Sequence, residues 1–225
     1  MASAFTHAFV AAVGAQVYRP RGDAWRVYGA AMLCAVLPDL DLIGFAFGVD
    51  YADLLGHRGL THSLLIAVLV GIVATLFVCS GLSRFSGQWW AAVLFFSCAT
   101  ASHGLLDAMT DGGLGVAFFS PLDRARYFFP WRPLRVPPIG IELFFSRWGL
   151  QVIASELLWI WLPGLAIGAA ACVVRRWIGS SRRDHNSIRV IAGRRTHEEG
   201  EGATRRWAPD TTSGRGNEDR TGRYD

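Results

Sequence analysis

Histidine and arginine are concentrated in HRGLTHS, residues 57–63, directly before a strongly apolar stretch. Imidazole nitrogens bind divalent metals such as zinc, iron, nickel and copper. Two histidines five residues apart do not share one face of a straight helix. We therefore expect His57 in a loop and His62 in the first helical turn, with Gly59 turning the chain and Thr61 as the N-cap. A single histidine here would more simply be a hydrogen-bonded core residue, whereas the pair favours metal binding.

Carboxylates and two further histidines occur at other apolar places in the chain. Asp39 and Asp41 lie in LPDLDLI, where burying an unpaired charge is costly. His103 and Asp107 are spaced i, i+4 and so share a helical face. His7 lies near the start of the first apolar stretch. The alternatives are a turn or cap for the two aspartates and a local hydrogen bond for the His103–Asp107 pair. A nearby cation would offset the buried negative charge, so the pattern favours a metal site.

The elements that must position these residues are predicted to be membrane helices. The chain has 225 residues, is 52% hydrophobic and has a mean hydropathy of +0.28, which is high for a soluble protein. A crossing takes about 20 helical residues, and the apolar stretches near that length are residues 62–82, 89–106 and 148–174. The stretches 5–17 and 25–37 are shorter and predict either a hairpin dipping into the membrane or two tilted crossings, the second ending at Pro38. A signal peptide over residues 1–17 is disfavoured because the start is not basic. The sequence thus predicts an all-α polytopic membrane bundle of four to five helices.

An up-and-down arrangement of these helices brings the polar residues to one membrane face. The candidate set is His7, Asp39, Asp41, His57, His62, His103 and Asp107. Mixed imidazole and carboxylate ligands indicate zinc or manganese, and a structural zinc site is disfavoured because the set has no cysteine. Seven candidates exceed the four ligands of one tetrahedral zinc. Either two ions share the site, or some candidates orient the true ligands and carry protons.

The charge distribution separates the membrane part from a tail. Residues 1–178 are predicted to form the membrane domain, and residues 179–225, rich in Arg, Gly, Thr and Asp, are predicted to be disordered and cleaved rapidly by protease. Arg175 and Arg176 after the last helix predict a cytoplasmic tail, although five arginines in the loop 109–147 weaken this orientation. No nucleic-acid-reading module accompanies the basic tail, so nucleic-acid binding is not expected. The four cysteines lie in apolar runs and are expected to be buried hydrophobes.

Three motifs carry a family resemblance. LPDLD, HRGLTHS and SHGLLD, in this order and separated by apolar helices, resemble the YdjM-like membrane-bound metal-dependent hydrolases, whose founding member is named for its LexA-regulated gene. Thr6-His7 and the segment FFSPLDRARYFFPWRPLRVPPIG, residues 118–140, also fit this family. The resemblance covers residues 1–175 and implies a bacterial inner-membrane protein whose polar site is the set of seven residues above. One departure is Leu42, where many members have histidine.

The resemblance implies a metal-dependent hydrolase. Because the predicted site opens at the membrane face, an amphiphilic ester or phosphoester is the expected substrate. On this hypothesis the catalytic residues are Asp39, His57 and Arg58, and the metal ligands are His7, Asp41, His62, His103 and Asp107. The predicted substrate-binding residues are Arg124, Arg126 and Arg132, because guanidinium groups match phosphate and carboxylate oxygens. An alternative for these three arginines is anchoring at lipid headgroups beside the aromatic residues 127–131.

Two other functional classes stay open from the sequence. A metal-binding membrane protein without hydrolytic activity, either a transporter or a regulatory scaffold, is supported by Glu156 inside the last apolar stretch, because carboxylates within membranes often mark ion paths. A bis-histidine haem protein is the third reading, and it predicts a Soret absorption band.

Overall fold

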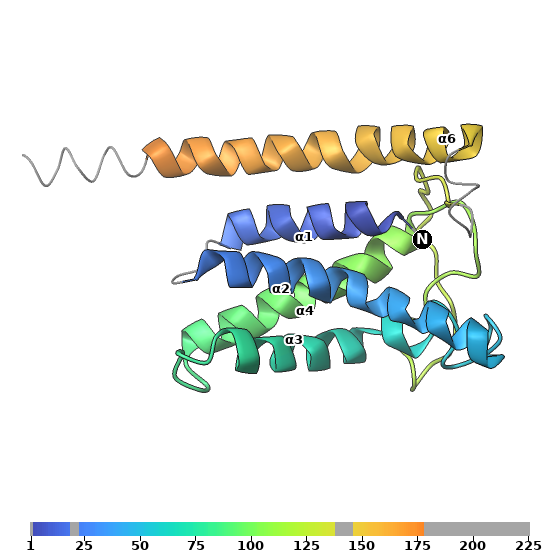
Figure 1. The fold of residues 1–225 in the computed structure, drawn as a ribbon, viewed down its shortest axis with the longest axis horizontal. Helices are drawn as coiled ribbons and strands as arrows, with labels where there is room; N and C mark the ends of the chain where they lie inside the picture. Colours follow the sequence, from blue (N-terminus) through green and yellow to red (C-terminus); the bar gives the residue numbers. More distant parts are fainter. Residues whose placement is uncertain (1, 19–22, 138–145, 178–225) are drawn as a thin grey trace, which may run out of the picture. The chain divides into compact units, whose positions relative to one another are not determined.

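The computed structural model describes residues 2–18, 23–137 and 146–177, and this part of the chain is helical (Figure 1). The elements are α1 (Ala4–Tyr18), α2 (Ala24–Val36), the 3₁₀ helices η1 (Leu37–Phe47) and η2 (Leu60–His62), α3 (Leu64–Val78), α4 (Gly87–Ala108), α6 (Arg147–Glu156) and the π-helical segment η3 (Leu157–Trp161). Only two isolated β-bridges occur among the described residues. The predicted all-α helical fold is therefore confirmed. The predicted disordered tail, residues 179–225, lies outside the described residues.

Three of the described helices begin at serine caps, at Ser63, Ser86 and Ser146. The hydroxyl of Ser63 accepts a hydrogen bond from the backbone N–H of Ile66 at the start of α3, and Ser86 does the same for Trp89 at the start of α4. The expectation that Thr61 caps the helix was therefore wrong. Thr61 lies one turn earlier, in η2, because its hydroxyl is used by a carboxylate from another element, as described below. His62 consequently ends a 3₁₀ turn instead of opening the α-helix.

The α-helix α2 ends at Val36, next to the Pro38 at which the sequence predicted its end, but the chain stays helical beyond it. It tightens into the 3₁₀ helix η1, so that Ala24–Phe47 is one helical stretch of 24 residues. Pro38 lies in the first turn of η1 and cannot donate a backbone hydrogen bond, and the carbonyl oxygen of Ala35, three residues earlier, lies 2.7 Å from His103 Nδ1 instead. A 3₁₀ helix has three residues per turn. Asp39 and Asp41 therefore point in directions about 120° apart and reach different partners.

Within the part of the chain that the structure describes, three helical stretches are long and apolar enough to cross a membrane, namely Ala24–Phe47, Gly87–Ala108 and Arg147–Trp177. The helices α1 and α3 have 15 residues each and are apolar but shorter. The stretch expected at 62–82 thus yields a shorter helix than its hydropathy predicts. The last helix, in contrast, continues through Pro163. The π-helical turn η3 ends just before this proline, and its wider turn makes room for a residue that cannot donate the usual backbone bond.

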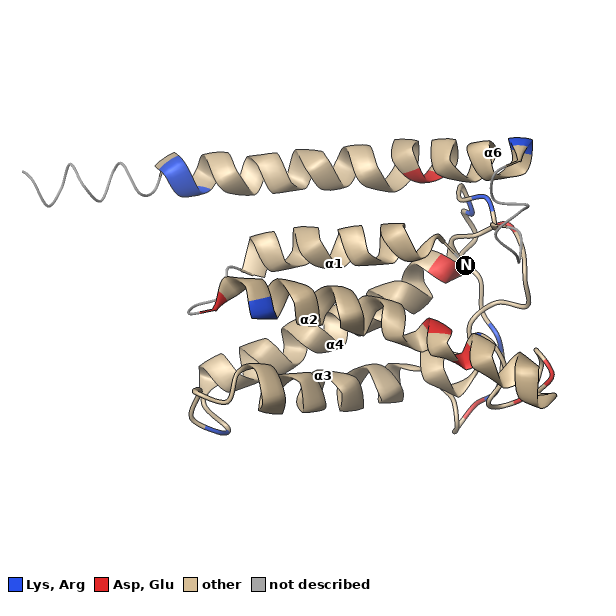
Figure 2. Ribbon diagram, viewed as in Figure 1, with Lys and Arg blue, Asp and Glu red and all other residues tan. Residues whose placement is uncertain are grey.

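Small residues let the helices approach one another closely. A Cβ at Gly71 of α3 would lie 2.1 Å from Ser97 Oγ and 2.7 Å from Ser97 N of α4, so only glycine fits this contact. The core between α1, α2 and α4 is built largely from alanines, with Phe96 fully buried among them. Figure 2 shows that charged residues are sparse along these helices and that acidic residues gather toward the end where the N-terminus lies. Packing thus places the polar residues at one end of an apolar bundle.

Candidate metal centre

Four side chains from three helical segments converge on one point. Asp39 comes from η1, His62 from η2, and His103 and Asp107 from α4, and one donor atom of each lies within 4.8 Å of all the others. His103 Nε2 and His62 Nε2 are 3.2 and 3.8 Å from Asp39 Oδ1, and 3.7 and 3.5 Å from Asp107 Oδ2. Ligands bound to a tetrahedral zinc at about 2.0–2.1 Å are about 3.3 Å apart. The four atoms are therefore spaced much as the ligands of one metal ion are.

The two imidazole rings are held with their Nε2 atoms toward this point. His103 Nδ1 lies 2.7 Å from the backbone carbonyl oxygen of Ala35, and His62 Nδ1 lies 3.2 Å from Asp41 Oδ2. An oxygen acceptor at Nδ1 fixes the proton there and leaves the lone pair on Nε2, as in metal-binding histidines. Among the described residues, neither Nε2 atom and neither carboxylate oxygen of Asp39 has a hydrogen-bond partner, although all are buried. Buried polar atoms are nearly always paired, and a bound cation would satisfy these four.

Asp41 organises the HRGLTHS segment from outside. Its Oδ1 is 2.7 Å from His57 Nδ1, and its Oδ2 accepts hydrogen bonds from the Thr61 hydroxyl at 2.6 Å and from the Arg58 backbone N–H at 3.3 Å. The turn in this segment is made at Arg58, whose φ of 63° lies in the left-handed region. Gly59 is required for a different reason from the one expected, because a Cβ there would lie 2.4 Å from Leu54 O.

Arg58 is fully buried and lies between Asp107, Gly112 and Thr110. Its Nε lies 3.2 Å from Asp107 Oδ2, and its Nη atoms donate to Gly112 O at 3.0 Å and to the Thr110 hydroxyl at 3.1 Å. The centre thus contains three carboxylates and one guanidinium, which leaves two negative charges when the histidines are neutral. Uncompensated charge is costly away from water. One divalent cation would neutralise the group.

His7 lies beside the four converging atoms and not among them. Its ring stacks on that of His103 with a centroid distance of 3.7 Å, and its Nε2 is 3.6 Å from Asp107 Oδ1. The same oxygen accepts a hydrogen bond of 2.9 Å from the backbone N–H of Ala2. The residues at the start of the chain therefore form one wall of the centre. Among these, Thr6-His7 was the only signal in the sequence.

Glu156 holds this first segment to the last helix. Its carboxylate accepts hydrogen bonds from the Ser3 backbone N–H, from the Ser3 hydroxyl at 2.6 Å and from the Thr6 hydroxyl at 2.8 Å. Trp161 adds a bond of 2.8 Å from its indole N–H to the Thr6 hydroxyl. Glu156 is 3% exposed, so its charge is matched by protein donors and not by water. This carboxylate therefore serves packing between α1 and α6, a role that the sequence did not indicate.

The three loop arginines are in different environments. Arg126 donates to the backbone oxygens of Tyr51, Asp53 and His57 at 2.9–3.2 Å and so braces the loop that carries His57. Arg132 lies over the ring of Phe128 at 4.8 Å, as expected for the alternative in which it accompanies the aromatic residues. Arg124 and Arg126 line one pocket together. Substrate binding by these residues stays a prediction.

The pKa of His62 makes metal binding pH-dependent. Burial lowers this pKa, but hydrogen bonding and charge from Asp107 and Asp41 outweigh burial and raise it from 6.5 to about 9 in the metal-free protein. A metal ion must therefore displace a proton below that pH. We expect the apparent metal affinity to rise about tenfold per pH unit from about pH 7 and to level off near pH 9. Competition titrations against a chromophoric chelator measure this, and an affinity that is constant above about pH 7 would contradict it.

Comparison with known proteins adds the family. Residues 1–179 match the YdjM inner membrane protein family. The chain is also 38% identical over 178 residues to inner membrane protein YbcI of Escherichia coli (strain K12), an alignment that covers 74% of this chain and 95% of that protein. The chain belongs to the YdjM inner membrane protein family. The resemblance predicted from LPDLD, HRGLTHS and SHGLLD is confirmed, and so is the inner membrane. No solved structure matches the chain.

Proposed function

We propose that this member of the YdjM family is a membrane-bound metal-dependent hydrolase that acts on an ester or phosphoester at the membrane surface. The observation that carries the proposal is the convergence of Asp39, His62, His103 and Asp107 with their donor atoms buried and turned inward. A divalent ion held there would lower the pKa of a bound water and polarise a carbonyl or phosphoryl oxygen. The proposal includes a multi-pass topology with a cytoplasmic tail, supported by Arg175 and Arg176 after the last apolar helix.

The geometry supports a division of roles that differs from the one expected from the sequence. Asp39 fits a metal ligand, because both of its buried oxygens lack hydrogen-bond partners among the described residues. Asp41 fits a positioning residue, because its oxygens are engaged by His57 and Thr61. Zinc or manganese suits the mixed ligand set. One ion is favoured over two, since a single divalent charge balances the three carboxylates and Arg58.

His57 is the residue best suited to accept the proton of an attacking water. Its Nδ1 is held by Asp41 Oδ1, so the tautomer with a lone pair on Nε2 is favoured, and that atom has no hydrogen bond within the described residues. Tyr51 contacts the ring edge-on at a centroid distance of 5.2 Å and limits access of bulk water. Arg58 fits a structural cation that fixes Asp107.

The alternatives from the sequence have less support in this geometry. The transport reading rested on Glu156, and its carboxylate is engaged by Ser3 and Thr6. A haem between two histidines needs room for a planar macrocycle, but the His62 and His103 rings are only 4.7 Å apart between centroids. A metal-binding scaffold without turnover is distinguished from a hydrolase by the following experiment.

Substitution of His62 tests the proposal directly. We expect the purified full-length protein in detergent to hold about one divalent ion per chain and to hydrolyse members of an ester and phosphoester panel, and His62→Ala to lose both properties. Metal analysis and initial rates measure the two outcomes, with His185→Ala as a histidine control from the tail. Bound metal without hydrolysis of any ester would favour a scaffold, and uptake of metal into proteoliposomes would favour a transporter. Equal metal content in wild type and His62→Ala would refute the site.

The two aspartates of LPDLD provide a graded test of their roles. We expect Asp39→Asn to lower metal affinity by more than Asp41→Asn, because the first removes a ligand charge and the second disturbs the orientation of ligands. Loss of an orienting partner typically costs about 10–100-fold in metal affinity or activity. Affinities from chelator competition at one fixed pH decide the order. The reverse order would restore the assignment expected from the sequence, with Asp41 as the ligand.

A further inference from the structure

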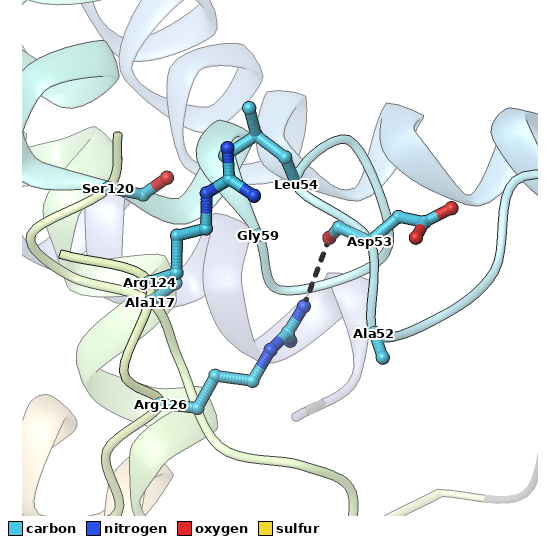
Figure 3. Close-up of a pocket in the computed structure, with 8 residues that line it drawn as sticks. All are labelled: Ala52, Asp53, Leu54, Gly59, Ala117, Ser120, Arg124 and Arg126. Carbon is cyan, nitrogen blue, oxygen red and sulfur yellow. Dashed lines mark hydrogen bonds between the residues drawn. The ribbon is translucent and has the colours of Figure 1, made fainter. Parts of the chain in front are cut away.

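A second polar pocket lies beside the loop that carries His57 and His62. It has a volume of about 120 Å³ and is lined by Ala52, Asp53, Leu54, Gly59, Ala117, Ser120, Arg124 and Arg126 (Figure 3). None of the four converging donor residues of the metal centre lines it. A space of this size accepts a compact group and excludes a large polar ligand. The side chains that face it decide what kind of group that is.

The two arginines contribute to this pocket in different ways. The guanidinium of Arg126 is occupied by backbone oxygens, including those of Asp53 and His57, and so forms part of the wall. Arg124 makes no hydrogen bond or ion pair within the described residues, and Figure 3 shows its guanidinium extended beside Leu54 and Ser120. Guanidinium donors match the oxygens of phosphate and carboxylate groups. Arg124 is therefore the cation available to a ligand.

Ser120 supplies an independent observation. It is 2% exposed, and its hydroxyl has no hydrogen-bond partner among the described residues. Figure 3 shows this hydroxyl directed toward the Arg124 side chain. A buried hydroxyl without a partner is destabilising, and a ligand oxygen would accept its hydrogen bond. Ser120 was not among the candidates expected from the sequence.

The electrostatics of the pocket favour an anion. The one acidic lining residue, Asp53, has its carboxylate turned away from Arg124, and that carboxylate accepts a hydrogen bond from the backbone N–H of Asp50. The hydroxyl and the guanidinium that remain are donors. A tetrahedral oxyanion such as a phosphate group can accept from both at once.

Exposed apolar side chains flank the pocket in sequence. Leu55 follows the lining residue Leu54, while Phe119 and Leu122 stand on either side of Ser120, and these three side chains are 60%, 53% and 96% exposed. Arginine with exposed leucine and aromatic residues is typical of the headgroup level of a membrane. The surroundings thus suit a phosphate attached to an apolar group.

We propose that this pocket binds the phosphate group of a phosphate-bearing ligand, with Arg124 and Ser120 as its donors. The inference rests on the proposed function in taking this ligand to be the substrate, which would then carry a phosphate group apart from the ester bond that is cut at the metal centre. The phosphate group can belong to a lipid or to a water-soluble molecule, because the recognising chemistry is the same. Phosphate binding here does not require a metal ion, since no residue of the converging four lines the pocket.

The test uses the full-length protein in a non-ionic detergent after removal of metal with a chelator. The probes are inorganic phosphate and a short-chain phosphatidic acid, titrated by calorimetry against protein and against empty micelles. We expect both to bind wild type, and Arg124→Gln to weaken both by about tenfold or more. Ser120→Ala should weaken both by a smaller factor. Arg84→Gln is the matched control, because Arg84 is an exposed arginine that does not line the pocket.

The outcomes separate the two ligand sources and the two proposals. Tighter binding of phosphatidic acid, by a margin that Leu122→Ser removes, identifies a lipid phosphate, whereas equal affinity for both probes identifies the phosphate of a water-soluble molecule; either supports the pocket. Failure of wild type to bind either probe, or equal affinities in Arg124→Gln and Arg84→Gln, would overturn it. His62→Ala should keep phosphate binding. Intact phosphate binding without hydrolysis rejects the proposed function alone, and hydrolysis without phosphate binding rejects this inference alone.

Discussion

Replacing Asp107 with alanine is expected to remove metal binding and to destabilise the protein by about 3–5 kcal/mol, because it leaves the buried Arg58 guanidinium without its carboxylate partner. Asp107 is fully buried and contacts Arg58, His62, His103 and His7 through its two oxygens. It also accepts the hydrogen bond from the Ala2 backbone N–H. One substitution thus disturbs three helical segments at once. Asp107→Asn should have a smaller effect on stability, since the amide keeps the shape and one acceptor oxygen.

The chain provides a matched control for this ion pair. Asp111 pairs with Arg135 at 2.8 Å, but the side chains are 31% and 60% exposed, and such surface pairs contribute about 0–1 kcal/mol. Thermal and denaturant unfolding of Asp107→Ala and Asp111→Ala in detergent compares the buried pair with the exposed one. The comparison is made on chelator-treated protein, so that loss of a bound ion does not add to the difference. Equal destabilisation by the two substitutions would show that the buried pair is not a structural requirement.

The sequence predicted the helical fold and the approximate place of the candidate site, but not the arrangement of side chains within the site. Hydropathy identified the apolar helices, because a run of about 20 apolar residues is typical of a membrane-spanning helix. The convergence of His62, His103 and Asp107 followed from their places at helix ends, because an up-and-down bundle brings alternate ends to one face. These inferences needed only chain order and helix length.

Positions within the site depended on contacts that sequence periodicity does not encode. The 3₁₀ geometry after Pro38 decides which of Asp39 and Asp41 faces the centre, and the alternation of polar and apolar residues in LPDLDLI does not indicate this choice. The helix cap is at Ser63 and not at Thr61 because Asp41 engages the Thr61 hydroxyl from a distance of 20 residues along the chain. Tertiary hydrogen bonds of this kind override local capping preferences.

The link between the last helix and the first residues was the least predictable feature. A carboxylate within a long apolar helix indicates an ion path when only the sequence is considered. Its partners are the small hydroxyl residues Ser3 and Thr6, separated from Glu156 by about 150 positions and without any charge to mark them. Only the folded structure shows that the Glu156 carboxylate is hydrogen-bonded by residues distant in sequence.

Replacing Glu156 with alanine is expected to loosen the first residues of the chain and to weaken metal binding about tenfold, although Glu156 is not one of the converging donors. The substitution removes the acceptor of three hydrogen bonds from Ser3 and Thr6. Hydrogen bonds to a charged group contribute about 1.5–3 kcal/mol each. The freed segment carries Ala2, which bonds Asp107, and His7, which stacks on His103. Loss of the Glu156 hydrogen bonds on the last helix should therefore disturb the metal centre through the first residues of α1.

Hydrogen exchange at residues 2–7 and metal affinity, measured on the same samples, test this connection. Gln151→Ala is the control, since Gln151 is an exposed residue of the same helix. Glu156→Gln keeps one acceptor oxygen and should give intermediate values in both measurements. Faster exchange in Glu156→Ala with unchanged metal affinity would show that the segment packs beside the centre without supporting it. If metal uptake into proteoliposomes depends on Glu156 while hydrogen exchange at residues 2–7 is unaltered, the result would instead support a role for Glu156 in ion transport.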